Sequence, residues 1–298
     1  MVESFKASGI KGLYSAQGLQ NAWFEPADKY TTNLNALISH EESSDFLKTF
    51  PALSTITSQF AKNANELAVY NNATYLTNLQ FCMEALNETR VLNVDHSTLV
   101  SKPNAGALLK SNNGTYTNTP IENGDLHEWI VESFGSLEEF RTLLLNQAHA
   151  IKGDGFTWLV ANNASGDAKR MDLENLFVVN TYNAGVPDDN VRGGQMNKLA
   201  DQQKETKPQQ EDIKSIDEEA LDRAMETIGT VESVYAKVNQ GKTNYVPILC
   251  LNASPKAYLA DYGVFGKRQY LDNVWECIDW EVVERRAPSR EKRSSSYI

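Results

Sequence analysis

Apolar residues recur at helical intervals through the first third of the chain. Within residues 16–50 and 51–86 they return about every three or four positions, a spacing that gathers them on one face of a helix. Pro26 has no backbone N–H, so we expect it to bend or restart the first helix. The pair Asn71-Asn72 interrupts the second pattern and predicts a kink. The apolar positions are Leu19, Trp23, Leu34, Ile38 and Leu47, followed by Leu53, Ile56, Phe60, Leu67, Tyr70, Leu79 and Met83.

The pattern changes beyond the second helical segment. Residues 87–124 become rich in Asn, Thr, Ser and Gly, which predicts a surface loop that links two domains. A helix is expected to begin near Asp125 and to end at Gly135. Ser136 and Glu139 have the spacing of a capping box, in which each side chain bonds a backbone N–H of the same helical turn. A second helix is therefore predicted to begin at Ser136.

Three runs of β-branched and aromatic residues follow and predict strands at 156–162, 174–182 and 246–252. Helices come first, and helices with a short antiparallel sheet come second, so we expect an α+β fold. The predicted domains are an N-terminal helical hairpin at 1–86, a polar connecting loop at 87–124, and a C-terminal α+β domain at 125–298 with an insertion at 185–244.

The connections of the second domain are also predicted from their composition. Residues 165–170 should form a hairpin turn, residues 184–215 an exposed and partly mobile segment, and residues 216–238 a helix that begins at the capping box of Ser215 and Glu218. A last helix is expected around 270–280, before a basic, Ser-rich tail from Arg285.

Composition limits the classes of function. The chain has 298 residues and a formal net charge of −11, which argues against a protein that wraps nucleic acid by charge alone, although a local basic patch remains compatible with it. No apolar run approaches the roughly 20 residues of a membrane-spanning helix, so we expect no membrane partner. The three cysteines, Cys82, Cys250 and Cys277, are widely spaced and are expected to be reduced and buried.

Three stretches of the chain resemble the iron/manganese superoxide dismutases. Residues 134–162 resemble that family's helix, Gly-x-Gly-aromatic-x-Trp turn and first strand. Residues 246–281 resemble its third strand, metal loop and C-terminal helix, with Trp275 and Trp280 in the family's terminal pattern. Residues 19–37 resemble its first helix. The resemblance implies the dismutase fold, with a three-stranded antiparallel sheet after a helical hairpin.

The resemblance also locates where the family's metal ligands would stand. That family binds one iron or manganese ion through three His and one Asp, and the matching positions here are Ala22, Asn78, Asn252 and Lys256. A methyl group and two amides replace good ligands, and an ammonium group repels a divalent cation. The four histidines, His40, His96, His127 and His149, are far in sequence from these positions, and we expect His149 to be structural. The resemblance therefore predicts no metal, no cofactor and no catalytic residue.

A fold kept without its ligands indicates a protein selected for its shape and surface. Fungal mitochondrial small ribosomal subunits contain superoxide dismutase-like proteins that lack the metal site, and this chain resembles that group. The resemblance implies a non-catalytic ribosomal component in the mitochondrial matrix. Two alternatives remain open: a catalytically inactive partner module outside the ribosome, and an active dismutase.

The same resemblance suggests which surfaces would meet partners. In the family, a Glu in the metal loop pairs with the partner subunit's metal-bound His, and here Pro255 stands at that Glu position. A symmetric homodimer would lose this bridge twice. We therefore expect the face that includes Tyr30, Pro255 and Tyr258 to bind a different protein, such as a second dismutase-like subunit in a heterodimer. The basic tail at 290–298 is the candidate for contact with rRNA, and its alternative is a solvated terminus.

Overall fold

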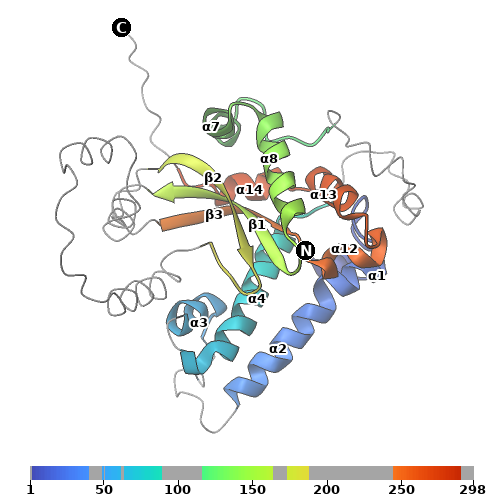
Figure 1. Cartoon of the computed structure of the whole chain (residues 1–298), viewed down its shortest axis with the longest axis vertical. Helices are drawn as coiled ribbons and strands as arrows, with labels where there is room; N and C mark the ends of the chain where they lie inside the picture. Colours follow the sequence, from blue (N-terminus) through green and yellow to red (C-terminus); the bar gives the residue numbers. More distant parts are fainter. Residues whose placement is uncertain are drawn as a thin grey trace, which may run out of the picture.

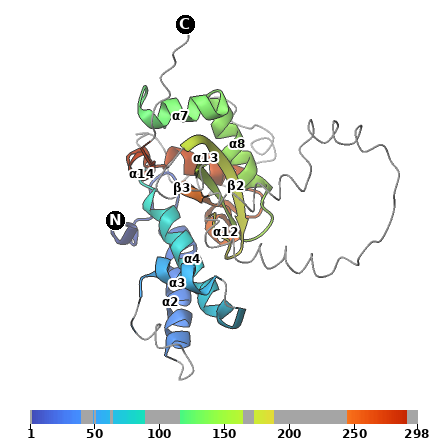
Figure 2. The same cartoon turned by 90° about the vertical axis from the view of Figure 1, so that its left-hand side faces the viewer.

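The structure, a computed structural model, describes residues 2–39, 49, 51–61, 64–88, 116–163, 173–187 and 244–289. Its first half contains the helices α1 (Ala16–Leu19), α2 (Glu25–Ile38), α3 (Leu53–Phe60) and α4 (Leu67–Glu84). The part from residue 125 onward contains α7 (Asp125–Phe134), α8 (Leu137–Ala150), α12 (Pro255–Tyr262), α13 (Lys267–Glu276) and α14 (Trp280–Arg286), with strands β1 (Gly155–Asn163), β2 (Leu173–Tyr182) and β3 (Asn244–Asn252). Helix α7 lies at one end of the sheet, and helices α2, α3 and α4 lie at the opposite end (Figures 1 and 2).

The predicted three-stranded antiparallel sheet is present. Its strand order is β2-β1-β3, and both pairs are antiparallel. The three predicted strand ranges agree with the observed ones to within two residues at either end. The α+β fold is thereby confirmed.

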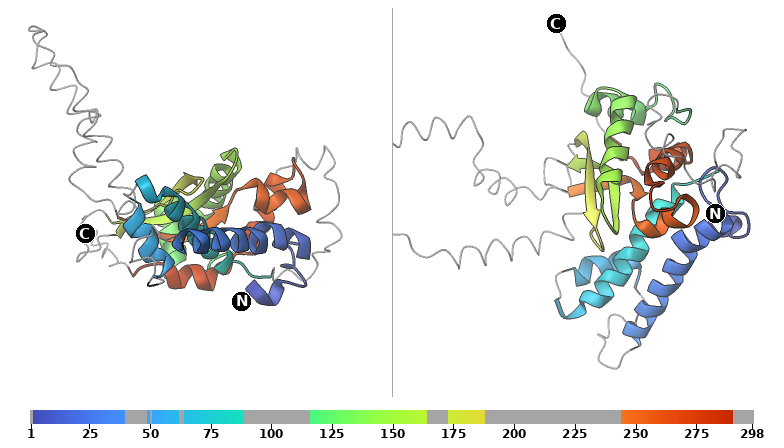
Figure 3. Two further views of the ribbon diagram at one scale, coloured as in Figure 1. Left: turned by 90° about the horizontal axis from the view of Figure 1, so that it is seen from below. Right: turned by 45° about the vertical axis from the view of Figure 1, so that its right-hand side comes forward.

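Both faces of the central strand β1 are buried, which explains why it is apolar along nearly its whole length. Phe156, Trp158 and Val160 pack with residues of α4 in one cluster. Leu159 and Ala161 face the other way and pack in the main core, which includes residues of α7 and α8. Successive side chains of a strand point to opposite faces, so a sheet with helices on both sides needs apolar residues at every position. Figure 3 shows the helices around the sheet from two further directions.

The first helix continues past Pro26 because a π-helical turn, one residue longer than an α-helical hydrogen-bonded turn, precedes the proline. A π-helical turn, Gln20–Phe24, joins α1 to α2, and the N–H of Glu25 donates to the carbonyl of Gln20, five residues back. A proline ring clashes with the carbonyl four residues before it, here that of Ala22, and the wider turn leaves room for the ring. The predicted disturbance at Pro26 therefore takes the form of a π-turn, without a restart of the helix.

The predicted interruption at Asn71-Asn72 is wrong. Helix α4 runs without a break from Leu67 to Glu84. The side-chain amide of Asn72 donates to the carbonyl of Ala68, one turn earlier, at 2.7 Å. The side chain is thus accommodated within the helix instead of competing with it.

The prediction for the last helix needs a correction. The predicted helix at 270–280 is divided into α13 and α14, which are separated by Cys277, Ile278 and Asp279. These residues pair with the end of α4: the N–H of Asn87 donates to the carbonyl of Cys277, and the N–H of Asp279 donates to that of Ala85, both at 2.8 Å. The pairing with a distant segment interrupts the helix, and the expected tail from Arg285 begins inside α14.

The predicted helix boundaries around Gly135 are confirmed. Gly135 ends α7 with φ at 92°, a conformation that favours glycine. Ser136 caps α8, because its Oγ accepts the N–H of Glu139 at 3.1 Å. The three cysteines are buried and form no disulfide bond with one another, as expected. The predicted turn at 165–170, the predicted helix at 216–238 and the tail at 290–298 lie outside the described residues, as does most of the 184–215 segment.

Candidate functional site

Three of the four expected ligand positions line one small cavity. Ala22 comes from the π-turn, Asn252 from the end of β3, and Lys256 from the first turn of α12. The cavity has a volume of about 10 Å³. That is about the least space that holds one water molecule. The other lining residues are Pro26, Tyr30, Tyr75, Leu79, Asp154, Phe156 and Ser254.

The two asparagines at ligand positions are used as structural groups. Asn252 is buried, and its Oδ1 accepts the N–H of Ser254 at 3.0 Å, which holds the turn between β3 and α12. Asn78 is also buried, but it does not line the cavity. Its Nδ2 donates to the carbonyl of Gly185 at 2.9 Å and so fastens α4 to the segment after β2. The structure therefore brings Ala22, Asn252 and Lys256 together, and directs the amide donor of Asn78 elsewhere.

Lys256 forms an ion pair at the cavity. Its Nζ lies 2.6 Å from Oδ2 of Asp154, in the turn before β1. Partial burial lowers the pKa of Lys256, but the hydrogen bond and charge of Asp154, together with Tyr30, outweigh it and raise the pKa above its ordinary value. The ammonium group therefore stays charged at neutral pH. Because the pair is partly exposed to solvent, which screens its charges, we expect it to add little to stability.

The residues present do not fit an iron or manganese ion. At the expected positions they offer a methyl group, amide groups already in hydrogen bonds, and a positively charged ammonium group that repels a metal cation. Within the part of the chain that the structure describes, no group of three or more His, Cys, Asp or Glu side chains is placed to hold a metal. His149 is exposed at the end of α8 and does not line the cavity.

The residues expected at the partner face lie around this cavity. Tyr30 stacks on Tyr75, with ring centroids 4.9 Å apart and planes at 5°. Pro255 is half-buried at the start of α12, and Tyr258 is half-buried one turn later. The ring of Tyr258 lies 5.9 Å from that of Tyr270. Tyr30 and Lys256 line the cavity together, whereas Pro255 and Tyr258 do not line it.

A buried chain of tyrosines next to the cavity was not predicted from the sequence. Tyr14 and Tyr270 share a hydrogen bond of 2.9 Å between their hydroxyl groups, and Tyr270 donates to the carbonyl of Asn252 at 2.9 Å. Burial raises the pKa of both tyrosines well above the ordinary value. Both tyrosine hydroxyl groups therefore stay protonated at neutral pH and have a structural role. No local sequence signal pairs Tyr14 with Tyr270, because the two residues lie 256 positions apart.

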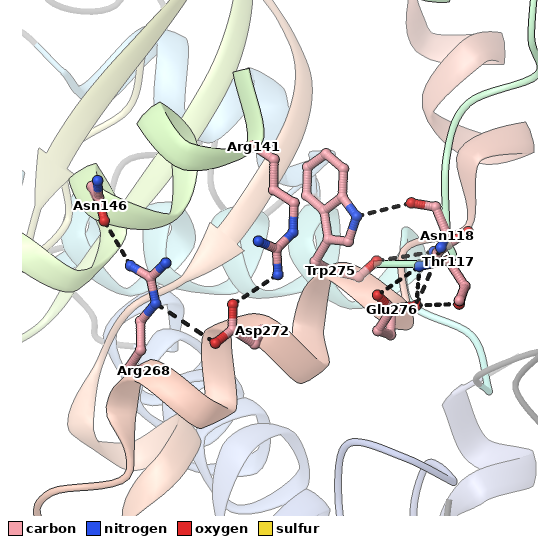
Figure 4. Close-up of polar contacts among 8 residues, drawn as sticks. All are labelled: Thr117, Asn118, Arg141, Asn146, Arg268, Asp272, Trp275 and Glu276. Carbon is pink, nitrogen blue, oxygen red and sulfur yellow. Dashed lines mark hydrogen bonds and ion pairs between the residues drawn. The ribbon is translucent and has the colours of Figure 1, made fainter. Parts of the chain in front are cut away.

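A network of polar contacts joins α8, α13 and the segment before α7 (Figure 4). Nη2 of the buried Arg141 lies 2.8 Å from Oδ1 of Asp272, and the guanidinium group lies 5.6 Å from the ring of Trp275. Asn118 accepts a hydrogen bond from the Trp275 indole and donates to the carbonyls of Trp275 and Ile278. These contacts hold α13, which supplies Tyr270, in a fixed position beside the candidate site.

The free energy of unfolding is expected to rise with pH from about 8 towards 10.5 because of Lys267. Burial, and then the charge of Lys152, lowers the pKa of Lys267 from its ordinary 10.5 to about 8. Between these values the unfolded chain binds more protons than the folded chain, so stability increases with pH. Below a pH of about 8, Lys267 is charged in both states, and the full cost of burying its charge is present.

Urea unfolding at a series of pH values measures this effect. Lys267→Met should flatten the rise, whereas Lys29→Met, which removes an exposed lysine of α2, should leave it in place. An equal rise in the wild type and in Lys267→Met would show that another group causes it.

Comparison with known proteins agrees with this geometry. Residues 122–187 and 220–286 match the family described as iron/manganese superoxide dismutases, C-terminal domain. The chain therefore contains a C-terminal domain of the iron/manganese superoxide dismutase family, and its helical N-terminal region precedes that domain.

Two curated relatives match over short stretches. Small ribosomal subunit protein mS42 of Schizosaccharomyces pombe is 49% identical over 41 residues, which is 14% of this chain and 19% of that protein. Small ribosomal subunit protein mS43 of the same yeast is 44% identical over 45 residues, 15% of this chain and 17% of that protein. Each alignment thus spans less than a fifth of the relative's length. No helix among the described residues is long and apolar enough to cross a membrane.

Proposed function

We propose that this chain is a non-catalytic structural component of the small subunit of the mitochondrial ribosome. In this proposal a superoxide dismutase-like fold serves as a protein-interaction module in translation, and the protein works in the mitochondrial matrix without a membrane partner. The observation that carries the proposal is the state of the metal site. The fold and its aromatic core are kept, whereas the ligand positions hold Ala22, Asn78, Asn252 and Lys256.

The matches to the two relatives favour a ribosomal role over a role as an inactive partner module outside the ribosome. Both are named as small ribosomal subunit proteins, and both match a chain that contains a dismutase-family domain. A fold does not by itself define a function, so the donor set decides between catalysis and structure. An active dismutase would need metal ligands that this cavity does not offer.

We further propose that the face with Tyr30, Pro255 and Tyr258 binds a second dismutase-like subunit. Pro255 has neither a charge nor a backbone N–H, and Lys256 is already paired within its own chain with Asp154 at 2.6 Å. A reciprocal bridge between two copies of this chain is therefore disfavoured, because an isologous interface repeats each loss. A different subunit with a complementary surface fits the face better.

Cross-linking within intact small subunits tests the proposed function and its partner. A photoreactive residue at position 258 is expected to label another dismutase-like protein of the subunit. The same residue at position 29, on the exposed side of α2, serves as the matched control and should give a different product. Labelling of rRNA alone, or of a second copy of this chain, would contradict the heterodimer.

A further inference from the structure

A cluster of cationic side chains lies where the end of α8 meets the start of α13. Lys267 is 8% exposed, and its Nζ donates to the carbonyl of Ile151 at 2.6 Å. Arg268 donates to Oδ1 of Asn146 at 2.6 Å (Figure 4). Lys152, the next residue after Ile151, is exposed. With His149, also exposed at the end of α8, these residues form what we call the basic cluster: His149, Lys152, Lys267 and Arg268.

Few negative charges balance the basic cluster. Asp272 is shared by two guanidinium groups, at 2.8 Å from Arg141 and 3.6 Å from Arg268. The nearby Asp154 is occupied by Lys256. Partial desolvation, and then the charges of Lys152, Lys267 and Arg268, lowers the pKa of His149, which agrees with a local excess of positive charge. This excess occurs on a chain whose formal net charge is −11.

The carboxyl end of α8 favours nearby cations, and Lys267 bonds its C-cap residue Ile151, but the dipole of α13 does not favour Lys267 and Arg268. Lys267 and Arg268 occupy the first turn of α13, which has no acidic residue, and Gly266 provides no side-chain cap. The amino end of a helix carries partial positive charge, so cations there are unfavourable and acidic residues are preferred. A sequence that departs from a local rule in this way often does so at a functional surface.

Exposed apolar side chains lie beside the basic cluster. Val264 and Phe265 are 71% and 76% exposed, in the turn between α12 and α13. The turn is well defined: Gly263 has φ at +69°, and the N–H of Gly266 donates to the carbonyl of Gly263. A β-carbon at Gly266 would lie 2.2 Å from the carbonyl oxygen of Tyr262, so only glycine allows this close approach. Phe265 is thus presented to solvent two residues before Lys267.

We propose that the α12–α13 turn and the basic cluster bind single-stranded RNA. A base would stack on the ring of Phe265, and backbone phosphates would pair with Lys152 and Arg268, while Lys267 adds to the local potential. An exposed aromatic ring next to cations suits single strands, because every base has a π-face and every nucleotide a phosphate. An acidic peptide would use the cations but would gain little from a single exposed ring. The choice of RNA also rests on the proposed ribosomal function.

Binding of the full chain to a fluorescently labelled oligouridine tests this proposal, with anisotropy as the readout. Phe265→Ala is expected to weaken binding by about fivefold or more, the loss of one stacked base. Lys152→Glu should weaken binding and lower the slope of log affinity against log salt by about 1 or more. The matched controls are Lys29→Glu, an exposed lysine of α2, and Tyr182→Ala, a 56% exposed aromatic residue of β2, and both should bind as the wild type does.

The outcomes separate this proposal from its alternatives. Equal affinities for Lys152→Glu and Lys29→Glu would place the RNA contact elsewhere, including the 290–298 tail, which all these variants keep. Tighter binding of labelled oligoglutamate than of RNA, with the same dependence on Lys152, would replace RNA by an acidic protein segment. A chain that resides in small subunits but binds no RNA through Phe265 overturns this proposal alone. Binding through Phe265 by a chain absent from small subunits overturns the ribosomal function instead.

Discussion

The purified protein is expected to contain far less than one iron or manganese ion per chain and to show no superoxide dismutation above background. Lys256 keeps a positive charge beside the cavity, and the Asn252 side-chain oxygen already accepts a backbone hydrogen bond. The remaining cavity of about 10 Å³ leaves little space for an ion with its ligands. Elemental analysis after expression in medium supplied with both metals measures the first quantity, and a superoxide assay measures the second.

A catalytically active dismutase, expressed and purified in the same way, is the control for metal supply. The single reversions Lys256→His and Asn252→Asp provide a stricter comparison, because each returns one ligand type while the other positions stay unsuitable. Neither is expected to recover a bound ion. About one iron or manganese ion per wild-type chain, with activity that a chelator removes, would contradict the loss of the site.

Replacing Arg141 with leucine is expected to lower the free energy of unfolding by about 3 kcal/mol. Arg141 is 6% exposed and pairs with Asp272 at 2.8 Å, so its loss leaves a poorly solvated carboxylate with a weaker partner. Arg268, at 3.6 Å, still faces Asp272 and keeps the effect at the lower end of the range for a broken buried pair. Chemical denaturation followed by circular dichroism measures the change.

A double-mutant cycle shows whether the pair is the cause. Asp272→Leu combined with Arg141→Leu should lose much less stability than the sum of the two single variants, because neither member of the buried pair is then left without the other. Arg285→Leu removes an exposed arginine of α14 and should change stability by less than about 0.5 kcal/mol. Additive losses in the cycle would mean that Arg141 acts through its packing against Trp275.

Local patterns were sufficient for the sheet and for the boundary between α7 and α8. The central strand β1 carries a dense run of apolar residues because both of its faces are buried, and such a run is visible in the sequence. The start of α8 was predicted because Ser136 and Glu139 act within a single turn. Three residues of the cavity, Ala22, Asn252 and Lys256, were also predicted, because they occupy the positions that match the family's metal ligands.

Contacts between distant segments could not be predicted in this way. The gap between α13 and α14 exists because Cys277 and Asp279 pair with the end of α4, almost two hundred residues earlier. The direction of the Asn78 amide depends on Gly185, which lies beyond β2. The basic cluster joins residues of α8 and α13 that are separated in the sequence by three strands. Each of these features depends on tertiary packing, which overrides or adds to local propensity.

Sedimentation of mitochondrial ribosomes most directly tests the central claim, that this dismutase-like chain is a ribosomal component. A tagged full-length chain, expressed in cells and followed through a sucrose gradient, is predicted to migrate with the small subunit. It should remain with the small subunit after the two subunits are dissociated by lowering the magnesium concentration. A chain found only at the top of the gradient, with free soluble proteins, would contradict the claim.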